Sequence, residues 1–92
     1  MSHHPDHSKE LNRLNRIAGQ VDGVRKMIEE QRYCTDILTQ LRAIRSALHS
    51  VEANILEAHL SSCVADALHS GDSTVQEAKI AELKDLYKRF GS

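Results

Sequence analysis

The stretch CTDILTQLRAIRSALHSVEANILEAHLSSC, residues 34–63, decides the fold. Its apolar residues recur in steps of three and four, at Cys34, Ile37, Leu41, Ile44, Leu48, Val51, Ile55 and Ala58. Such a heptad-like stripe is typical of a helix that packs against another helix. No Gly or Pro follows before Gly71, so the pattern predicts one helix of roughly 35 residues, about 50 Å long at 1.5 Å per residue.

A shorter helix is predicted on each side of this long one. The preceding helix is expected to start near Asp6 or Ser8 and to run to about Glu30, with an apolar stripe of Leu11, Leu14, Ile17, Val21, Val24 and Ile28. Gly19 and Gly23 lie one turn apart in it, which predicts that another backbone packs closely there. After Gly71, a capping box from Ser73 to Gln76 predicts the last helix, with a stripe of Val75, Ile80, Leu83, Leu86, Tyr87 and Phe90.

The composition fits an all-α protein of one domain. The chain has 92 residues, no Trp and three aromatic residues, and its apolar content is mainly Leu, Ile, Val and Ala, which favours helix packing over a sheet. We therefore expect a three-helix protomer over residues 8–92, preceded by a mobile, His-rich tail at residues 1–7. A monomer this short buries little of its surface, so it is expected to form oligomers.

Several classes of protein are disfavoured by the sequence. No stretch approaches the ~20 apolar residues that span a bilayer, and no signal peptide is recognisable, so a cytoplasmic location is expected. Two cysteines in a reducing cytosol are more plausible as ligands or redox groups than as a disulfide. We find no paired general acid and base, which disfavours an enzyme. From Ser8 to Arg45 there are eight Lys/Arg against five Asp/Glu, a weak indication of an anionic partner.

The cysteines and one histidine have the spacing of a metal site. His59 and Cys63 lie one turn apart on the long helix, about 6 Å apart at Cβ. Cys34 is the natural third ligand, but along one helix it lies roughly 37 Å from His59. An antiparallel pair of long helices, with its two-fold axis near residue 47 or 48, instead brings Cys34 of one chain to His59 and Cys63 of the other. The alternative is that Cys34 only packs at a helix end and that the other pair is incidental.

Two thiolates and one imidazole form a soft donor set. This set favours Cu(I) in a three-coordinate site, and Zn(II) or Ni(II) if a fourth ligand joins. The tail offers His3, His4 and His7 as possible extra ligands. A tail without any specific role is the alternative.

The pattern Arg-Leu-x-Arg-Ile-x-Gly-Gln at 13–20, then Tyr33-Cys34, then His59-x-x-x-Cys63, resembles the CsoR/RcnR family of bacterial metal-responsive repressors along nearly the whole chain. The resemblance implies a three-helix protomer, an antiparallel dimer with a four-helix core, and a disc-like dimer of dimers. It also implies that the metal-free protein binds operator DNA and that Cu(I) releases it, so that metal efflux genes are expressed.

Carried over by residue, the resemblance assigns Cys34, His59 and Cys63 as ligands of the copper-sensing branch, with Tyr33 and Glu82 as groups that surround them. The RcnR branch has His at the position of Cys63, which counts against nickel and cobalt. For DNA, Arg13 and Arg16 match family positions, and Arg42 and Arg45, a turn apart on the long helix, are expected to extend the same surface. The alternative is that these side chains are only solvated or paired with Glu10, Asp22 or Asp36. A nickel or cobalt repressor that uses the tail histidines, a metal chaperone without DNA binding and a thiol-based sensor remain alternatives.

Overall fold

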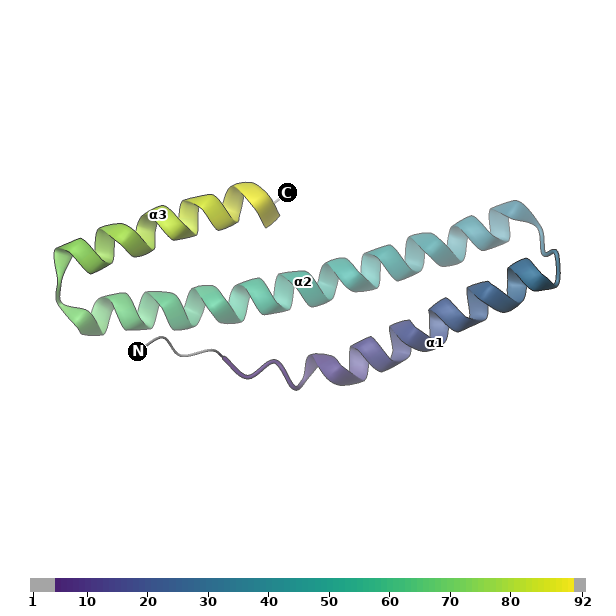
Figure 1. The fold of residues 1–92 in the computed structure, drawn as a ribbon, viewed down its shortest axis with the longest axis horizontal. Coiled ribbons are helices and arrows are strands. Elements are labelled where there is room, and N and C mark those ends of the chain that lie inside the picture. The colour runs from purple at the N-terminus through teal and green to yellow at the C-terminus, as the bar shows by residue number, and fades with distance from the viewer. Residues whose placement is uncertain (1–4, 91–92) are drawn as a thin grey trace. The chain divides into compact units, whose positions relative to one another are not determined.

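The computed structural model describes residues 5–90 and contains three helices. They are α1 (Glu10–Glu29), α2 (Cys34–Ser70) and α3 (Ser73–Phe90), as Figure 1 shows. The predicted all-α protomer with a long second helix is confirmed, since α2 has 37 residues. The chain divides into two compact units, which are described separately: His7–Val51, and residues 52–90 together with residues 5–6.

In the His7–Val51 unit, α1 begins later than the sequence predicts. The helix starts at Glu10, and Lys9 at its N-cap makes no side-chain cap hydrogen bond. A backbone bond from Glu10 N to His7 O, 2.9 Å long, forms a preceding turn. The first backbone N–H groups therefore find a partner in the turn, so no capping side chain is needed.

The turn between α1 and α2 is a Schellman motif. Arg32 N donates to Met27 O at 2.9 Å and Gln31 N donates to Ile28 O at 3.1 Å. These two bonds define the motif, in which the first residue after the C-cap adopts a left-handed conformation. That residue is Gln31, with φ 56°, although glycine is the usual choice there because it has no Cβ.

Only some residues of the apolar stripe of α2 pack into the core of this unit. Ile17 and Val24 of α1 pack with Ile44 and Val51 of α2, while Ile37 and Ala47 pack against this cluster. The other stripe members Leu41 and Leu48 stay 45% and 42% exposed. Part of the predicted helix-packing face of α2 is therefore covered by α1, and another part remains exposed in the protomer.

Close backbone packing at the two α1 glycines is not found within the chain. A Cβ built at Gly19 or at Gly23 meets nothing within 4 Å. The expectation that another backbone lies there is therefore wrong for the described protomer.

In the second unit, α3 runs back beside the last part of α2 (Figure 1). Gly71, with φ 65°, ends α2 as predicted. The predicted capping box is wrong: Asp72 caps α3 instead, because its Oδ1 accepts a 2.8 Å hydrogen bond from Thr74 N. The Gln76 side chain donates to Ala67 O of α2 at 3.2 Å, which ties the two helices together.

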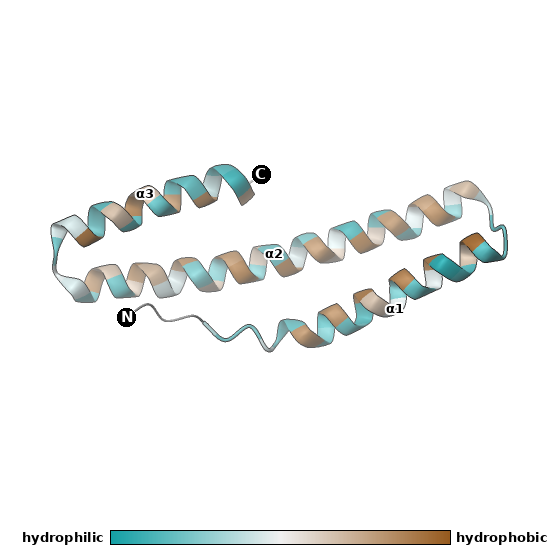
Figure 2. Cartoon of the chain, viewed as in Figure 1, coloured by the Kyte–Doolittle hydropathy of each residue, from teal (hydrophilic) through white to brown (hydrophobic). Residues whose placement is uncertain are grey.

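Burial in the second unit is slight. Of its large apolar residues and cysteines, Cys63 alone is buried, and the exposed ones are Ile55, Val64, Leu68, Val75, Ile80, Tyr87 and Phe90. Figure 2 shows hydrophobic residues on all three helices. A protomer with so little buried core gains little free energy from folding alone, which favours association with further chains. Within residues 5–90, no helix is long and apolar enough to cross a membrane.

Candidate metal centre

The second unit brings three possible metal ligands together. His59 and Cys63 lie one turn apart on α2, so their side chains leave the same face, and α3 adds Glu82. One ligand atom from each of the three lies within 4.8 Å of the others. Cys63 is 4% exposed, whereas the His59 and Glu82 side chains are 40% and 41% exposed. The group is thus reachable from solvent on its His and Glu side.

A hydrogen bond fixes the orientation of the His59 ring. Its Nε2 lies 2.8 Å from Glu82 Oε1, and an ionised carboxylate can only accept, so Nε2 carries the proton. In the neutral ring, Nδ1 then has the lone pair that a metal ion needs. A carboxylate behind a histidine ligand sets the tautomer in this way in many metal sites.

The same hydrogen bond controls the charge of Glu82. It is the largest cause that lowers the pKa of Glu82 below the usual 4.5, burial opposes it, and nearby Lys79 adds to it. Lys79 Nζ lies 3.8 Å from Glu82 Oε2. Glu82 is therefore ionised at neutral pH, and both of its oxygens have positively polarised neighbours.

The donor set of one chain fits a soft metal ion incompletely. His59 and Cys63 supply one imidazole and one thiolate, and the carboxylate of Glu82 is a hard donor that Cu(I) does not favour. A divalent ion such as Zn(II) accepts all three donor types. A three-coordinate Cu(I) site needs a second thiolate, which this group does not contain.

The other metal ligands predicted from the sequence lie elsewhere. Cys34 is the first residue of α2 and is exposed, and the exposed Tyr33 precedes it. His7 is half-buried ahead of α1 and belongs to no group of metal-binding side chains in the described chain. His3 and His4 fall outside the described residues. The sequence analysis missed Lys79, although its place three residues before Glu82 on one helix puts both on one face.

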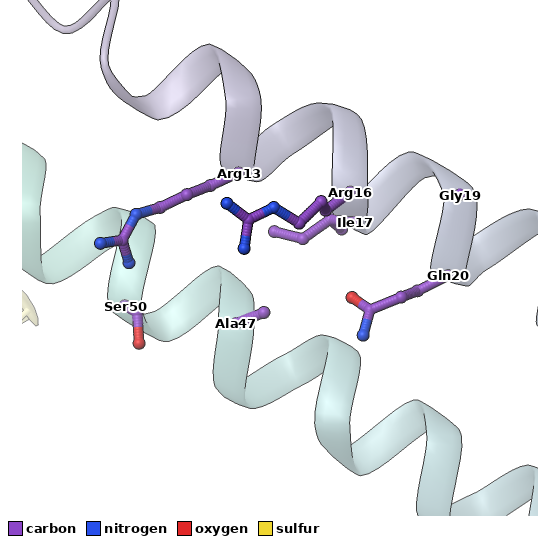
Figure 3. Close-up of a pocket in the computed structure, with 7 residues that line it drawn as sticks. All are labelled: Arg13, Arg16, Ile17, Gly19, Gln20, Ala47 and Ser50. Atoms are coloured by element: carbon purple, nitrogen blue, oxygen red, sulfur yellow. The ribbon is translucent and has the colours of Figure 1, made fainter.

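The predicted DNA-binding arginines line different hollows of the His7–Val51 unit, and Arg42 lines a further one of about 270 Å³ with Thr35, Leu38 and Thr39. Arg13 and Arg16 line a cleft of about 680 Å³ between α1 and α2 (Figure 3), which we call the arginine cleft. Its other lining residues are Ile17, Gly19, Gln20, Ala47 and Ser50. Arg42 and Arg45 line a hollow of about 290 Å³ on α2, together with Leu38 and Leu41.

The fold and these two features define a helical metal-binding protein with a basic surface. The chain matches the family model described as metal-sensitive transcriptional repressor over residues 6–89. It therefore belongs to this family of metal-sensitive transcriptional repressors, and it is not an enzyme.

Two curated relatives are copper sensors. The copper-sensing transcriptional repressor CsoR of Bacillus subtilis is 49% identical over 79 residues, which are 86% of this chain and 75% of the relative. The copper-sensing transcriptional repressor RicR of Mycobacterium tuberculosis is 50% identical over 78 residues, 85% of this chain and 80% of the relative.

Two solved structures are similar. One is the crystal structure of the copper-sensing repressor CsoR with Cu(I) from Geobacillus thermodenitrificans, with TM-score 0.76, 45% identity, and coverage of 92% of this chain and 85% of that chain. The other is the nickel-responsive transcriptional regulator InrS, with TM-score 0.81, 38% identity, and coverage of 96% of both chains.

Proposed function

We propose that this protein is a copper-responsive transcriptional repressor, which binds operator DNA without metal and leaves it when Cu(I) binds. The observation that carries the proposal is the His59–Cys63–Glu82 group, whose ligand atoms lie within 4.8 Å of one another and whose thiol is buried. Both curated relatives above are named for copper sensing. A DNA-binding repressor works where the DNA lies, so we also propose a cytoplasmic location.

The third Cu(I) ligand is Cys34 of a second chain. Leu41, Leu48 and Ile55 lie seven residues apart on α2 and are 45%, 42% and 36% exposed; we call them the dimer stripe. An antiparallel pair of α2 helices joined along this stripe buries it and pairs the start of one helix with the His59–Cys63 turn of the other. Each dimer then holds two sites, and two dimers form the tetramer.

Each further residue of the site has a role in holding the ligands. Glu82 keeps the His59 ring oriented through the 2.8 Å hydrogen bond, and this contact connects the ligand on α2 to α3. Tyr33 lies next to Cys34 in sequence, and in the proposed dimer it shields the Cys34 thiolate of its own chain. When bound, Cu(I) supplies a centre that draws two thiolates and one imidazole together.

The operator is bound by the basic residues of the His7–Val51 unit. Arg13 and Arg16 contact the phosphate backbone, and Arg42 and Arg45 extend the contact on α2. The described chain has no motif that inserts a recognition helix, so binding depends on charge and on the shape of the DNA.

Nickel is the second candidate effector. The likeness to InrS, a nickel-responsive regulator, at 38% identity supports it. In this version the His-rich tail at residues 1–7, outside the helical domain of residues 8–92, supplies a fourth ligand from His3, His4 or His7. Four-coordination suits Ni(II), whereas three-coordination selects Cu(I).

One anaerobic titration tests the function. A fluorescent duplex selected from random DNA by the metal-free protein is titrated with Cu(I) and, separately, with Ni(II), while anisotropy reports release. We expect release at one Cu(I) per chain and a weaker response to Ni(II). Equal binding with and without either metal would refute the repressor function and favour a metal chaperone. Release by Ni(II) alone, lost when residues 1–7 are deleted, would favour the nickel sensor.

A further inference from the structure

The arginine cleft presents a row of hydrogen-bond donors from α1 to α2. Arg13, Arg16 and Gln20 follow one another at helical spacings of three and four, so they share a face of α1. Figure 3 shows all three side chains reaching toward α2, where Ala47 and Ser50 lie. The floor is apolar at Ile17, and no carboxylate lines the cleft.

Most of these donors are not used inside the chain. Within residues 5–90, the side chains of Arg16 and Gln20 make no hydrogen bond or ion pair. Arg13 forms an ion pair with Glu10, with 3.7 Å between Nε and Oε1; this pair offsets part of its charge but is too long for a hydrogen bond. The Ser50 hydroxyl donates to Ser46 O of its own helix at 3.3 Å, a long bond that it can exchange for a better acceptor. The cleft is therefore positively charged and short of acceptors.

Gly19 adds an independent indication of an external ligand. Glycine is a poor helix former, yet it lies here in the middle of α1 at the wall of the cleft. Among residues 5–90, apart from its chain neighbours and the backbone of its own helix, nothing comes within 4 Å of the place where its Cβ would be, so packing between the described helices does not require glycine there. A bare backbone at that point allows a bulky group from outside to approach closely.

We propose that the arginine cleft holds one phosphodiester group of the operator, with the group lying over Gly19 and bound by Gln20 and Ser50 as well as by the two arginines. The inference rests on the proposed repressor function. Arg13 and Arg16 give charge-assisted hydrogen bonds to the phosphate oxygens. The amide of Gln20 and the hydroxyl of Ser50 add neutral donors that fix its position. A volume of about 680 Å³ leaves room for the flanking sugars.

The hollow at Arg42 and Arg45 is not an equivalent site. Its other lining residues, Leu38 and Leu41, are apolar and exposed, and Leu41 belongs to the dimer stripe. Helical spacing places Ser50 about 80° from Arg42 and about 140° from Arg45 around α2, so Ser50 does not share a face with both arginines. The two pairs of arginines therefore have different surroundings, and only the arginine cleft combines charge, neutral donors and a bare backbone.

Gly19→Ala and Gly23→Ala form a matched pair for the test. Both replace an exposed α1 glycine that has nothing within 4 Å, and both should strengthen the helix alike, but only Gly19 lines the cleft. Gln20→Ala is paired with Gln40→Ala, which changes an exposed α2 residue outside the cleft. Anisotropy at fixed salt measures binding to the duplex selected by the wild-type protein. Sedimentation measures the oligomer.

We expect Gln20→Ala to weaken DNA binding by about tenfold, the loss of one hydrogen bond to a charged group. Gly19→Ala should weaken it by a similar factor because its added methyl group keeps the phosphate from approaching the backbone, while both controls bind like wild type. Cu(I) should still bind at the wild-type stoichiometry. If either variant binds DNA like its control, the inference is wrong and the repressor function stands. If Gly19→Ala instead changes the oligomer, its glycine serves a contact between chains and the inference is also wrong. Failure of the wild-type protein to select any duplex overturns both.

Discussion

A mixture of two inactive variants should regain copper binding if the metal site is shared between chains. Cys34→Ala and Cys63→Ala each remove one thiolate from both sites of a homodimer, so neither variant alone should bind Cu(I) tightly. A heterodimer has one intact site, formed by the Cys34 of one chain and the Cys63 of the other, and one site that lacks both. With free exchange of equal amounts, half of the dimers are heterodimers, which gives about one quarter of a site per chain.

A second mixture supplies the matched control. Wild type mixed with the double variant Cys34→Ala/Cys63→Ala contains the same number of cysteines. In the shared-site arrangement its heterodimers have no intact site, and the mixture should again bind about one quarter of an ion per chain. A site within one chain would give nothing in the first mixture and about one half per chain in this one.

The assay is an anaerobic Cu(I) titration against a coloured chelator, with native mass spectrometry to measure the fraction of heterodimers. The reasoning fails if heterodimers form in the first mixture and its copper capacity stays at zero. It fails equally if the second mixture binds one half of an ion per chain.

Three further predictions follow from the protomer. Gln31→Gly should raise the free energy of unfolding by about 0.5–1 kcal/mol, because a left-handed residue with a Cβ is strained and the freer unfolded glycine chain offsets part of the gain; a lower stability in urea unfolding would contradict the assigned turn. His59→Ala should raise the pKa of Glu82 toward 4.5. The lowered pKa means that the contact stabilises the folded chain above pH 4.5 and that this stabilisation is lost as the pH falls through the lower value. If a carboxyl NMR titration finds the same pKa for Glu82 in the variant and in the wild type, the hydrogen bond is not formed in solution. Ile44→Ala should lower the free energy of unfolding by about 2–4 kcal/mol at every protein concentration, because Ile44 is buried within the chain. Leu48→Ala should instead weaken the dimer in sedimentation equilibrium. The reverse pattern would contradict the assignment of Ile44 to the core and Leu48 to the dimer stripe.

The periodicity of the sequence predicts the three helices, but it does not predict their caps or which partner covers each apolar face. An unbroken stripe from Cys34 to Ala58 predicts α2 because side chains three and four residues apart must share a face. It cannot say which partner covers that face, and the structure shows that Ile44 and Val51 meet α1 while Leu48 remains exposed. The cap of α3 was assigned to Ser73 because a capping box is a local pattern, yet the neighbouring Asp72 accepts the bond from Thr74 N.

The candidate metal site could be predicted only in part, because its residues come from two helices. His59 and Cys63 share a helix turn, so their proximity follows from spacing alone. Glu82 comes from another helix, and its place beside His59 depends on the turn at Gly71, which fixes how α3 returns along α2; the resemblance named it and spacing did not. The arginine cleft could not be predicted from spacing either, because Gln20 and Ser50 belong to different helices that meet only after folding.

The proposed dimer gives a physical route from metal to DNA. Cys34 belongs to the unit that carries the arginine cleft, whereas His59 and Cys63 belong to the other unit. An ion shared between chains therefore ties the DNA-binding unit of one chain to the His-Cys-Glu unit of its partner. Coupling between sites requires that metal binding and DNA binding favour different arrangements of the same parts. In the proposed dimer a bound ion would supply such a preference, because its three ligands would have to converge on one point; the Glu82 hydrogen bond connects the His59 ring to α3.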